Sequence, residues 1–247
     1  MKWPGKIRGV KRLYVCLLKA RHRLFLRGRD KRPVVESILN KDVVVLPGVM
    51  NPKLFRTGTF LAEHLTRSTV PEDALVLDMG TGSGIAALFA ATWARRVIAI
   101  DINPAAVKCA RINALLHDVQ HKVTVEQGDL FDTVGDKQFD LIIFNPPYLA
   151  GRAVNDFEKA LFGVETIAGF AGQVGSHLTD QGNVLLVLST LADRAQIIGF
   201  FSKAHLAAHL VAEKGYVNET LLLYRVTRSA ANSISESCAP SGETVRK

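Results

Sequence analysis

The stretch that decides the fold is ALVLDMGTGSG, residues Ala74 to Gly84. Its first four residues form a continuous apolar run, which is typical of a central parallel strand covered by helices on both faces. The run ends at Asp78 and passes into three alternating glycines, Gly80, Gly82 and Gly84. Glycine permits a sharp turn and a close approach of the backbone to a ligand. Because helix-forming residues follow, the stretch predicts a strand, a nucleotide-binding turn and a helix whose N-terminus faces the ligand.

A second apolar run that ends in an acid strengthens the prediction of a nucleoside ligand. Residues 97–100 are followed by Asp101, and a carboxylate at the tip of a neighbouring strand can accept both hydroxyls of a ribose. A glycine-rich turn alone is more often a plain turn, but this one lies between a strand and a helix and precedes Asp101. The turn lacks the sixth-position glycine of a dinucleotide site and the Gly-Lys-Ser/Thr of a P-loop, which leaves S-adenosylmethionine (SAM) as the cofactor.

Four segments in this order resemble the motifs of class I SAM-dependent methyltransferases: VLDMGTGSG, IAIDINPAAVKCARINA, VEQGDLFD and FDLIIFNPPY. The most specific is Asn-Pro-Pro-Tyr at 145–148, which is similar to a tetrad of enzymes that methylate a planar amide-like or aromatic amine nitrogen. These include HemK-type protein glutamine methyltransferases and adenine amino-methyltransferases. The resemblance covers residues 51–226. It implies an α/β, Rossmann-like fold: a seven-stranded, mostly parallel sheet with a terminal antiparallel hairpin and helices on both faces.

The tetrad suits the chemistry of a planar nitrogen, which is a poor nucleophile because its lone pair is delocalised. The side-chain carbonyl of Asn145 and the backbone carbonyl of Pro146 can accept the two N–H groups and aim the lone pair at the methyl sulfonium. Pro146 and Pro147 fix the backbone and have no N–H of their own. Tyr148 offers an aromatic face. Asn and Pro also occur in plain turns, but the carboxyl end of a central strand is where open α/β sheets bind ligands.

The cofactor site implied by the resemblance also includes the residues that follow the strand predicted at 122–128. In the family, an acid at the position of Asp129 accepts the adenine amino group and the next backbone N–H, here that of Leu130, meets the ring. A solvated loop is the alternative for Asp129. The expected cofactor-binding residues are Asp78, Gly80, Thr81, Gly82, Gly84, Asp101, Ile102, Asp129, Leu130 and Asn145.

Residues 51–65, NPKLFRTGTFLAEHL, are predicted to form a loop leading into a helix. They stand where HemK-type enzymes close over the cofactor. Those enzymes carry Pro-x-Glu-Asp-Thr or Pro-Arg-Pro-Glu-Thr where this chain has FRTGT, and the difference weakens the inference of a glutamine substrate. Arg56 and Thr59 are the candidates for contact with cofactor or substrate, with helix initiation as the alternative role of Thr59.

Several further elements follow from local pattern. Asn103 and Pro104 predict the capped start of a helix that reaches residue 117. Helical patterns also occupy the second half of 157–178 and residues 191–204, whereas 205–216 reads as a strand or a helix–strand junction. Additional strands are expected at 41–47, 122–128, 183–189 and 219–226. If 205–216 is a strand, it is joined to the strand at 219–226 through residues 215–218, a connection too short for a crossover, so the two must pair antiparallel.

Charge is concentrated at the N-terminus. Residues 1–33 contain twelve Lys or Arg and one acid, so their net charge is +11 and that of the remaining chain is −3, out of a total of +8. We divide the chain into a basic arm or small subdomain (1–40), a methyltransferase domain (41–228) and a tail expected to be disordered (229–247). The arm either packs on the domain, contacts phosphates of nucleic acid or the ribosome, or lies on a membrane surface.

Composition limits the class of protein. Three scattered cysteines and seven histidines show no ligand spacing, so we predict no metal site and a reducing, cytoplasmic location. Neither a secretory signal nor an apolar window of membrane-spanning length is evident.

The predicted function is N-methylation of a planar nitrogen, with a protein glutamine amide as the first choice. The alternative is the exocyclic amino group of an RNA or DNA base, in ribosomal or transfer RNA for example, which the basic arm favours because phosphates supply much of the affinity for nucleic acid. A small-molecule acceptor or a non-catalytic cofactor-binding module ranks lower, and the intact tetrad argues against the module.

Overall fold

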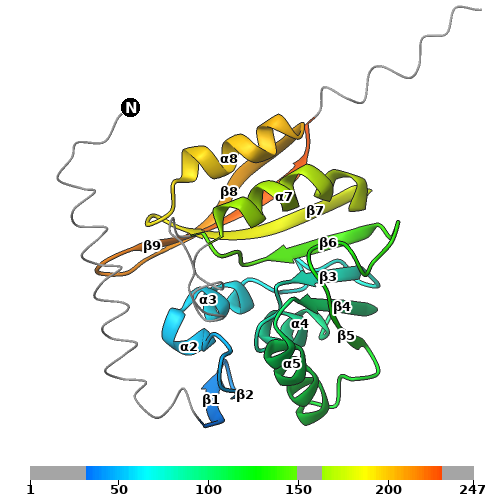
Figure 1. Cartoon of the computed structure of the whole chain (residues 1–247), viewed down its shortest axis with the longest axis vertical. Helices are drawn as coiled ribbons and strands as arrows, with labels where there is room; N and C mark the ends of the chain where they lie inside the picture. Colours follow the sequence, from blue (N-terminus) through cyan, green and yellow to red (C-terminus); the bar gives the residue numbers. More distant parts are fainter. Residues whose placement is uncertain (1–31, 149–162, 230–247) are drawn as a thin grey trace, which may run out of the picture.

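The computed structural model describes residues 32–148 and 163–229 and has a seven-stranded sheet at its centre (Figure 1). The sheet order is β5-β4-β3-β6-β7-β9-β8. The strands are β3 (Leu75–Met79), β4 (Arg96–Asp101), β5 (Val123–Gln127), β6 (Phe139–Phe144), β7 (Leu178–Ser189), β8 (Leu206–Gly215) and β9 (Thr220–Arg228). Strands β3 to β7 are parallel, and β9 is antiparallel to both β7 and β8. The predicted fold class is confirmed, including the antiparallel pairing of the last two strands.

Helices cover both faces of the sheet. They are α2 (Pro52–Phe55), α3 (Thr57–Glu63), α4 (Ile85–Ala90), α5 (Pro104–Leu116), α7 (Val164–Val174) and α8 (Arg194–Lys203), with a short 3-10 helix η1 (Gly175–His177). Val76 of β3 packs in a cluster with α3, α4 and α5, whereas its neighbour Leu77 packs in a second cluster with α7 and α8. Successive residues of a strand point to opposite faces, so a strand covered on both sides reads as a continuous apolar run.

The predicted boundaries hold where a local signal marks them. Helix α5 begins at Pro104, and the Asn103 side chain accepts a hydrogen bond from the Ala105 N–H at 2.9 Å. Helix α8 begins three residues later than predicted, because Asp193 caps it by accepting from the Gln196 N–H. Residues 206–215 form a strand, so the alternative of a helix–strand junction is wrong. Of the helical pattern at 157–178, the part up to residue 162 lies outside the described residues.

A hairpin that the sequence did not predict as a whole precedes the sheet. Strand β1 (Val34–Ile38) pairs antiparallel with β2 (Lys41–Val45) through the two-residue turn Leu39-Asn40, both with positive φ. This combination is typical of the turns that match the twist of a hairpin. The expected division of the chain at residue 40 falls within this turn. Residues 1–31 of the arm and 230–247 of the tail lie outside the described residues.

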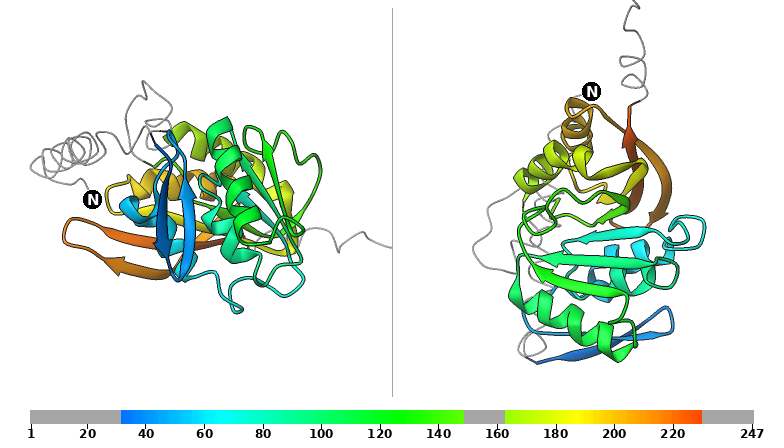
Figure 2. Two further views of the ribbon diagram at one scale, coloured as in Figure 1. Left: turned by 90° about the horizontal axis from the view of Figure 1, so that it is seen from below. Right: turned by 90° about the vertical axis from the view of Figure 1, so that its right-hand side faces the viewer.

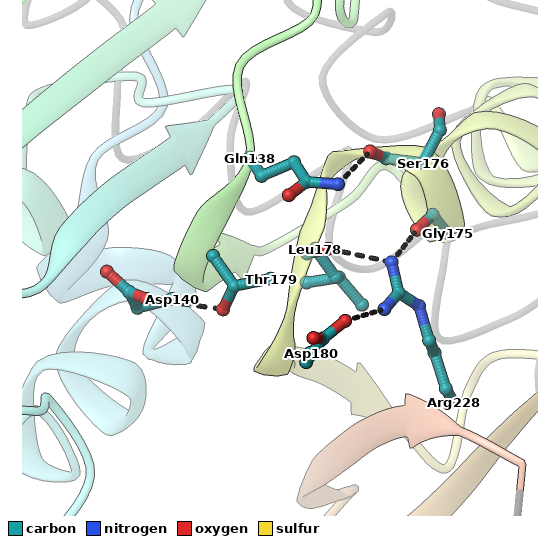
Figure 3. A network of polar contacts seen from close by, with 8 residues as sticks. All are labelled: Gln138, Asp140, Gly175, Ser176, Leu178, Thr179, Asp180 and Arg228. Atoms are coloured by element: carbon teal, nitrogen blue, oxygen red, sulfur yellow. Dashed lines mark hydrogen bonds and ion pairs between the residues drawn. The ribbon is translucent and has the colours of Figure 1, made fainter. Parts of the chain in front are cut away.

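A polar network links several strands where the parallel strands begin, at the edge opposite their carboxyl ends (Figure 3). Arg228, at the end of β9, donates to the carbonyls of Gly175 and Leu178 at 2.9 and 2.8 Å and pairs with Asp180 at 3.2 Å. Asp140 of β6 accepts from the Thr179 hydroxyl of β7 and from the Leu75 N–H of β3. The network therefore ties β3, β6, β7 and β9 together.

Replacing Arg228 by alanine is expected to lower the free energy of unfolding by about 1–2 kcal/mol, because two backbone carbonyls lose their charged donor. Urea denaturation of the variant measures the change. The matched control is Arg67→Ala, since Arg67 pairs with Glu72 while both side chains are largely exposed, and such pairs contribute little. Equal midpoints for the two variants would contradict a stabilising role of the network.

Within residues 32–148 and 163–229, no helix is long and apolar enough to cross a membrane.

Candidate active site

The glycine-rich turn lies at the carboxyl ends of the central strands. Its residues Gly80, Gly82 and Gly84 all have positive φ, at 67°, 57° and 81°. A Cβ atom added at Gly80 or Gly82 would meet no other atom within 4 Å, so open space adjoins the turn. A Cβ at Gly84 would instead come within 2.9 Å of Ala110 in α5. The first two glycines leave room for a ligand, and the third allows close packing of the turn on a helix.

Two carboxylates shape this turn from the ends of β3 and β4. Asp101 accepts the Gly82 N–H at 2.8 Å and the Asn103 N–H at 2.9 Å. Asp78 is buried, and one of its oxygens accepts the Thr81 hydroxyl at 2.6 Å and the N–H of Ala87 at 3.0 Å. Each acid therefore fixes part of the turn by accepting from its backbone or side chains.

Burial is the main cause of a raised pKa in both carboxyl groups, those of Asp78 and Asp101. It raises the pKa of Asp78 from 3.8 to about 6, against the opposing effect of the hydrogen bonds from Thr81 and Ala87, and the Asp101 carboxylate adds a smaller increase. Burial also raises the pKa of Asp101. The second carboxylate oxygen of Asp78, Oδ1, has no hydrogen-bond donor among the described residues. Two desolvated acids beside an open turn favour a ligand that carries positive charge and hydroxyl donors.

The expected adenine contacts lie along the same edge. Gly128 donates its N–H to the Asp101 carbonyl at 3.2 Å, which places the end of β5 beside the end of β4. Ile102 is 60% exposed and gives an apolar surface next to Asp101. Asp129 is exposed, and Leu130 has a φ of 48° and packs on the cluster beneath α7. The ends of β4 and β5, which are followed by Ile102 and by Asp129 and Leu130, therefore lie side by side.

The tetrad begins where β6 ends, one strand away from the glycine-rich turn. The side-chain amide of Asn145 donates to the Thr57 hydroxyl at 3.2 Å, and its Oδ1 has no donor among the described residues. Pro146 is buried, and Tyr148 packs partly buried on the cluster beneath α7. The Thr57 hydroxyl, at the start of α3, therefore fixes the orientation of the Asn145 side-chain amide.

The two candidates on the 51–65 segment have other contacts. The Arg56 guanidinium lies over the Tyr216 ring at 4.5 Å, near the connection between β8 and β9. The Thr59 hydroxyl donates to the Pro52 carbonyl at 3.1 Å. Helix α3 begins at Thr57 and not at Thr59, so the helix-initiating role of Thr59 is wrong. Thr57 is the residue that sequence reasoning missed, because no local pattern links it to Asn145, 88 positions away.

Among the described residues, no group of three or more His, Cys, Asp or Glu side chains is placed to hold a metal ion.

The sequence of the chain is similar to those of several known proteins. The chain is 37% identical over 129 residues to the release factor glutamine methyltransferase of Geobacter sulfurreducens, covering 49% of this chain and 44% of that protein. It is 35% identical over 180 residues to the protein of the same name from Koribacter versatilis, covering 64% and 61%. A ribosomal protein L11 methyltransferase from Geobacillus thermodenitrificans is 48% identical over 103 residues, covering 39% and 32%.

These matches span only about a third to three fifths of the relatives' own length. In fold, the chain is similar to the crystal structure of an M. jannaschii tRNA m1G37 methyltransferase, with a TM-score of 0.60, 20% identity, and coverage of 83% of this chain and 57% of that one. The pattern that defines the methyltransferase small domain matches residues 40–216, which include the glycine-rich turn and the tetrad. The chain therefore belongs to the methyltransferase small domain family.

Proposed function

We propose that this chain transfers a methyl group from SAM to a planar nitrogen, and that the acceptor is the side-chain amide of a glutamine in a protein. The observation that carries the proposal is the placement of Asn145 beside Thr57, one strand from the glycine-rich turn. An enzyme for this reaction needs a cofactor site and a rigid acceptor of N–H groups side by side. The ends of β3 and β6 offer both.

On the cofactor side, the residues present fit SAM. The open space at Gly80 and Gly82 accommodates a ligand close to the backbone, and Asp101 suits the ribose hydroxyls. The Oδ1 of Asp78, which accepts no hydrogen bond from the described part of the chain, would provide negative charge for a cationic ligand. Ile102 and the backbone of Leu130 would contact the adenine, with Asp129 accepting its amino group. When bound, SAM supplies an electrophilic methyl group on a positively charged sulfur.

On the acceptor side, the chain's own residues orient the nitrogen. Asn145 Oδ1 and the Pro146 carbonyl accept its two N–H groups, and Thr57 holds the Asn145 side chain in this orientation. Because the methylated nitrogen is a strong acid, it can lose its proton to water after transfer, and no general base is required. Tyr148 would contact the plane of the acceptor.

A protein acceptor is favoured over a nucleic acid by the names of the relatives. Both groups described above, the release factor glutamine methyltransferases and the L11 methyltransferase, are named for protein substrates. Glutamine is preferred to an L11-type acceptor because the longer match, over 180 residues, is to a glutamine methyltransferase. The alternative of an RNA base rests on the +11 charge of residues 1–33.

The acceptor can be identified by chemical release of the label. The full chain is incubated with methyl-labelled SAM and an extract that lacks this enzyme, and the products are treated with protease, ribonuclease or alkali. A methylated glutamine amide gives protease-sensitive label that alkali releases as volatile methylamine. Label that stays on protein after alkali would indicate an amino-group acceptor, and ribonuclease-sensitive label would move the assignment to an RNA base.

The buried Asp78 predicts a pH dependence of cofactor binding. Its pKa of about 6 means that the carboxylate forms only as the pH rises through 6, so the affinity for the SAM cation is expected to increase between pH 5 and 7. The Asp78→Asn variant is expected to bind SAM about tenfold more weakly at pH 7.5, because a charge-assisted contact is lost, and to show no such increase. Titration calorimetry across this range measures both.

The same shift has a stability consequence with a defined sign. Folding raises the pKa of Asp78 from 3.8 to about 6, so between these pH values the folded protein binds a proton that the unfolded chain has lost. The free energy of unfolding is therefore expected to fall as the pH rises from about 4 to above 6, by on the order of 3 kcal/mol. Urea unfolding of Asp78→Asn should therefore lack this decline. Asp136→Asn, at an exposed acid, is the control and should retain both pH profiles. Unchanged profiles in Asp78→Asn would contradict the role of this carboxyl.

A further inference from the structure

Asn113, in the middle of α5, is a buried polar residue that the proposed reaction does not use. Its side chain is 1% exposed and fully hydrogen-bonded. The Oδ1 atom accepts the Val44 N–H at 2.8 Å, and Nδ2 donates to the carbonyls of Val44 at 2.7 Å and Ser83 at 2.8 Å. The side chain thus pairs with Val44 as a neighbouring strand would and also reaches the glycine-rich turn.

Helix α5 fixes that turn at two positions. Ser83 stands between Gly82 and Gly84, and its carbonyl is held by Asn113. One helical turn earlier, Ala110 lies so close to Gly84 that no Cβ would fit there. Residues three apart on a helix share a face, so Ala110 and Asn113 together form the surface on which the turn rests. The direction of the Ser83 carbonyl therefore depends on Asn113.

The other partner of Asn113 is the hairpin β1–β2, which lies beside α5 (Figure 2). On its β1 strand, the buried Glu36 accepts the side-chain N–H₂ of Asn51 at 2.9 Å. Asn51 in turn caps α2 by accepting the N–H groups of Lys53 and Leu54. Helix α2 leads directly into α3, whose first residue is Thr57, the partner of Asn145. The hairpin therefore joins the turn to the segment that orients the acceptor.

We propose that Asn113 is a positioning residue that sets the geometry of the cofactor-binding turn and, through Val44, couples this turn to the hairpin. The inference rests on the proposed function, because it assigns the turn to SAM. A side chain with a structural role alone would affect stability and leave the affinity of the folded protein for the cofactor unchanged. A positioning residue also changes the affinity of the folded protein for the cofactor.

The chain offers a matched control on the same helix face. Cys109 donates its S–H to the same Val44 carbonyl at 3.2 Å but makes no bond to Ser83, and burial raises the pKa of its thiol to about 11, so it remains a neutral thiol at pH 7. Asn113→Ala removes the contact with the turn and the hairpin. Cys109→Ala removes the contact with the hairpin and a long contact, at 3.9 Å, in which Asn113 Nδ2 donates to the Cys109 sulfur. It leaves the bonds of Asn113 to Val44 and Ser83 in place.

The test measures binding of S-adenosylhomocysteine, the demethylated form of the cofactor, to the full-length chain by calorimetry. Asn113→Ala is expected to weaken binding by about tenfold to a hundredfold, the range typical of a displaced binding group, whereas Cys109→Ala binds as the natural chain does. Circular dichroism and cooperative urea unfolding establish that each variant is folded. A folded Asn113→Ala with unchanged affinity would overturn the proposal.

A measurement on the unmodified chain covers the case in which Asn113→Ala fails to fold. Saturation with S-adenosylhomocysteine is expected to slow hydrogen exchange of the Val44 amide by about tenfold or more, because Asn113 links it to the occupied turn. Protection of Gly82 and Gly84 without protection of Val44 would overturn the coupling. If the unmodified chain does not bind the ligand at all, the proposed function itself fails, and that result is distinct from both others.

Discussion

Replacing Asn145 by alanine is expected to lower the rate of methyl transfer by about two to three orders of magnitude, a loss typical of removing one group that orients or stabilises the reacting atoms. The affinity for SAM should stay nearly unchanged, because the turn and the acids that we propose to face the cofactor lie at the ends of β3 and β4. Single-turnover transfer measures the rate, and calorimetry with S-adenosylhomocysteine measures the affinity. Unaltered turnover in a folded variant would remove Asn145 from the proposed mechanism.

Thr57 provides a graded companion to this variant. Thr57→Val keeps the shape of the side chain but removes the hydroxyl that holds the Asn145 amide at 3.2 Å. We expect a fall in turnover of about fivefold, which corresponds to the roughly 1 kcal/mol of one neutral hydrogen bond. Thr57→Ser retains the hydroxyl and should restore most of the activity. Equal rates for the valine and serine variants would show that the hydroxyl does not orient Asn145.

The second large effect is expected from the glycine-rich turn, where neighbouring glycines should respond differently. Gly84→Ala places a Cβ within 2.9 Å of the Cα and Cβ of Ala110 at a φ of 81°, so the free energy of unfolding should fall by about 2–4 kcal/mol. Gly82→Ala also places alanine at a positive φ, 57°, but in open space, and should cost only about 1 kcal/mol. Its new methyl group instead enters the proposed cofactor site, and affinity should drop at least tenfold, by roughly 1.4 kcal/mol or more.

Urea unfolding and calorimetry on the same two variants separate these effects. The expected pattern is a crossed one: Gly84→Ala loses more stability, and Gly82→Ala loses more affinity relative to its stability. Gly175→Ala is a suitable control, because Gly175 lies in η1 at the opposite edge of the sheet, has open space and has a negative φ of −59°. If Gly82→Ala binds SAM as tightly as the control, the open side of the turn is not the cofactor site.

Most of the sheet, and the edge that we propose as the cofactor site, could be predicted from local sequence, for identifiable reasons. Strand β3 is recognisable because both of its faces are buried, which makes it a continuous apolar run. Helix α5 is recognisable because Asn103 and Pro104 form its start. Strand β1, in contrast, carries Glu36 in a buried position and Val35 in an exposed one, so its pattern does not resemble that of a core strand.

The sequence by itself determined the fold class, the turn of glycines, the acid at the end of each of the first two sheet strands and the tetrad after β6. Each of these is encoded by residues adjacent in the chain, where steric freedom, burial and hydrogen bonding act locally. Only the tertiary structure decided that Thr57 meets Asn145, and that Asn113 joins Val44 to Ser83. Those contacts connect residues 30 to 88 positions apart, and they depend on how helices and hairpin pack at the sheet, which no local spacing records.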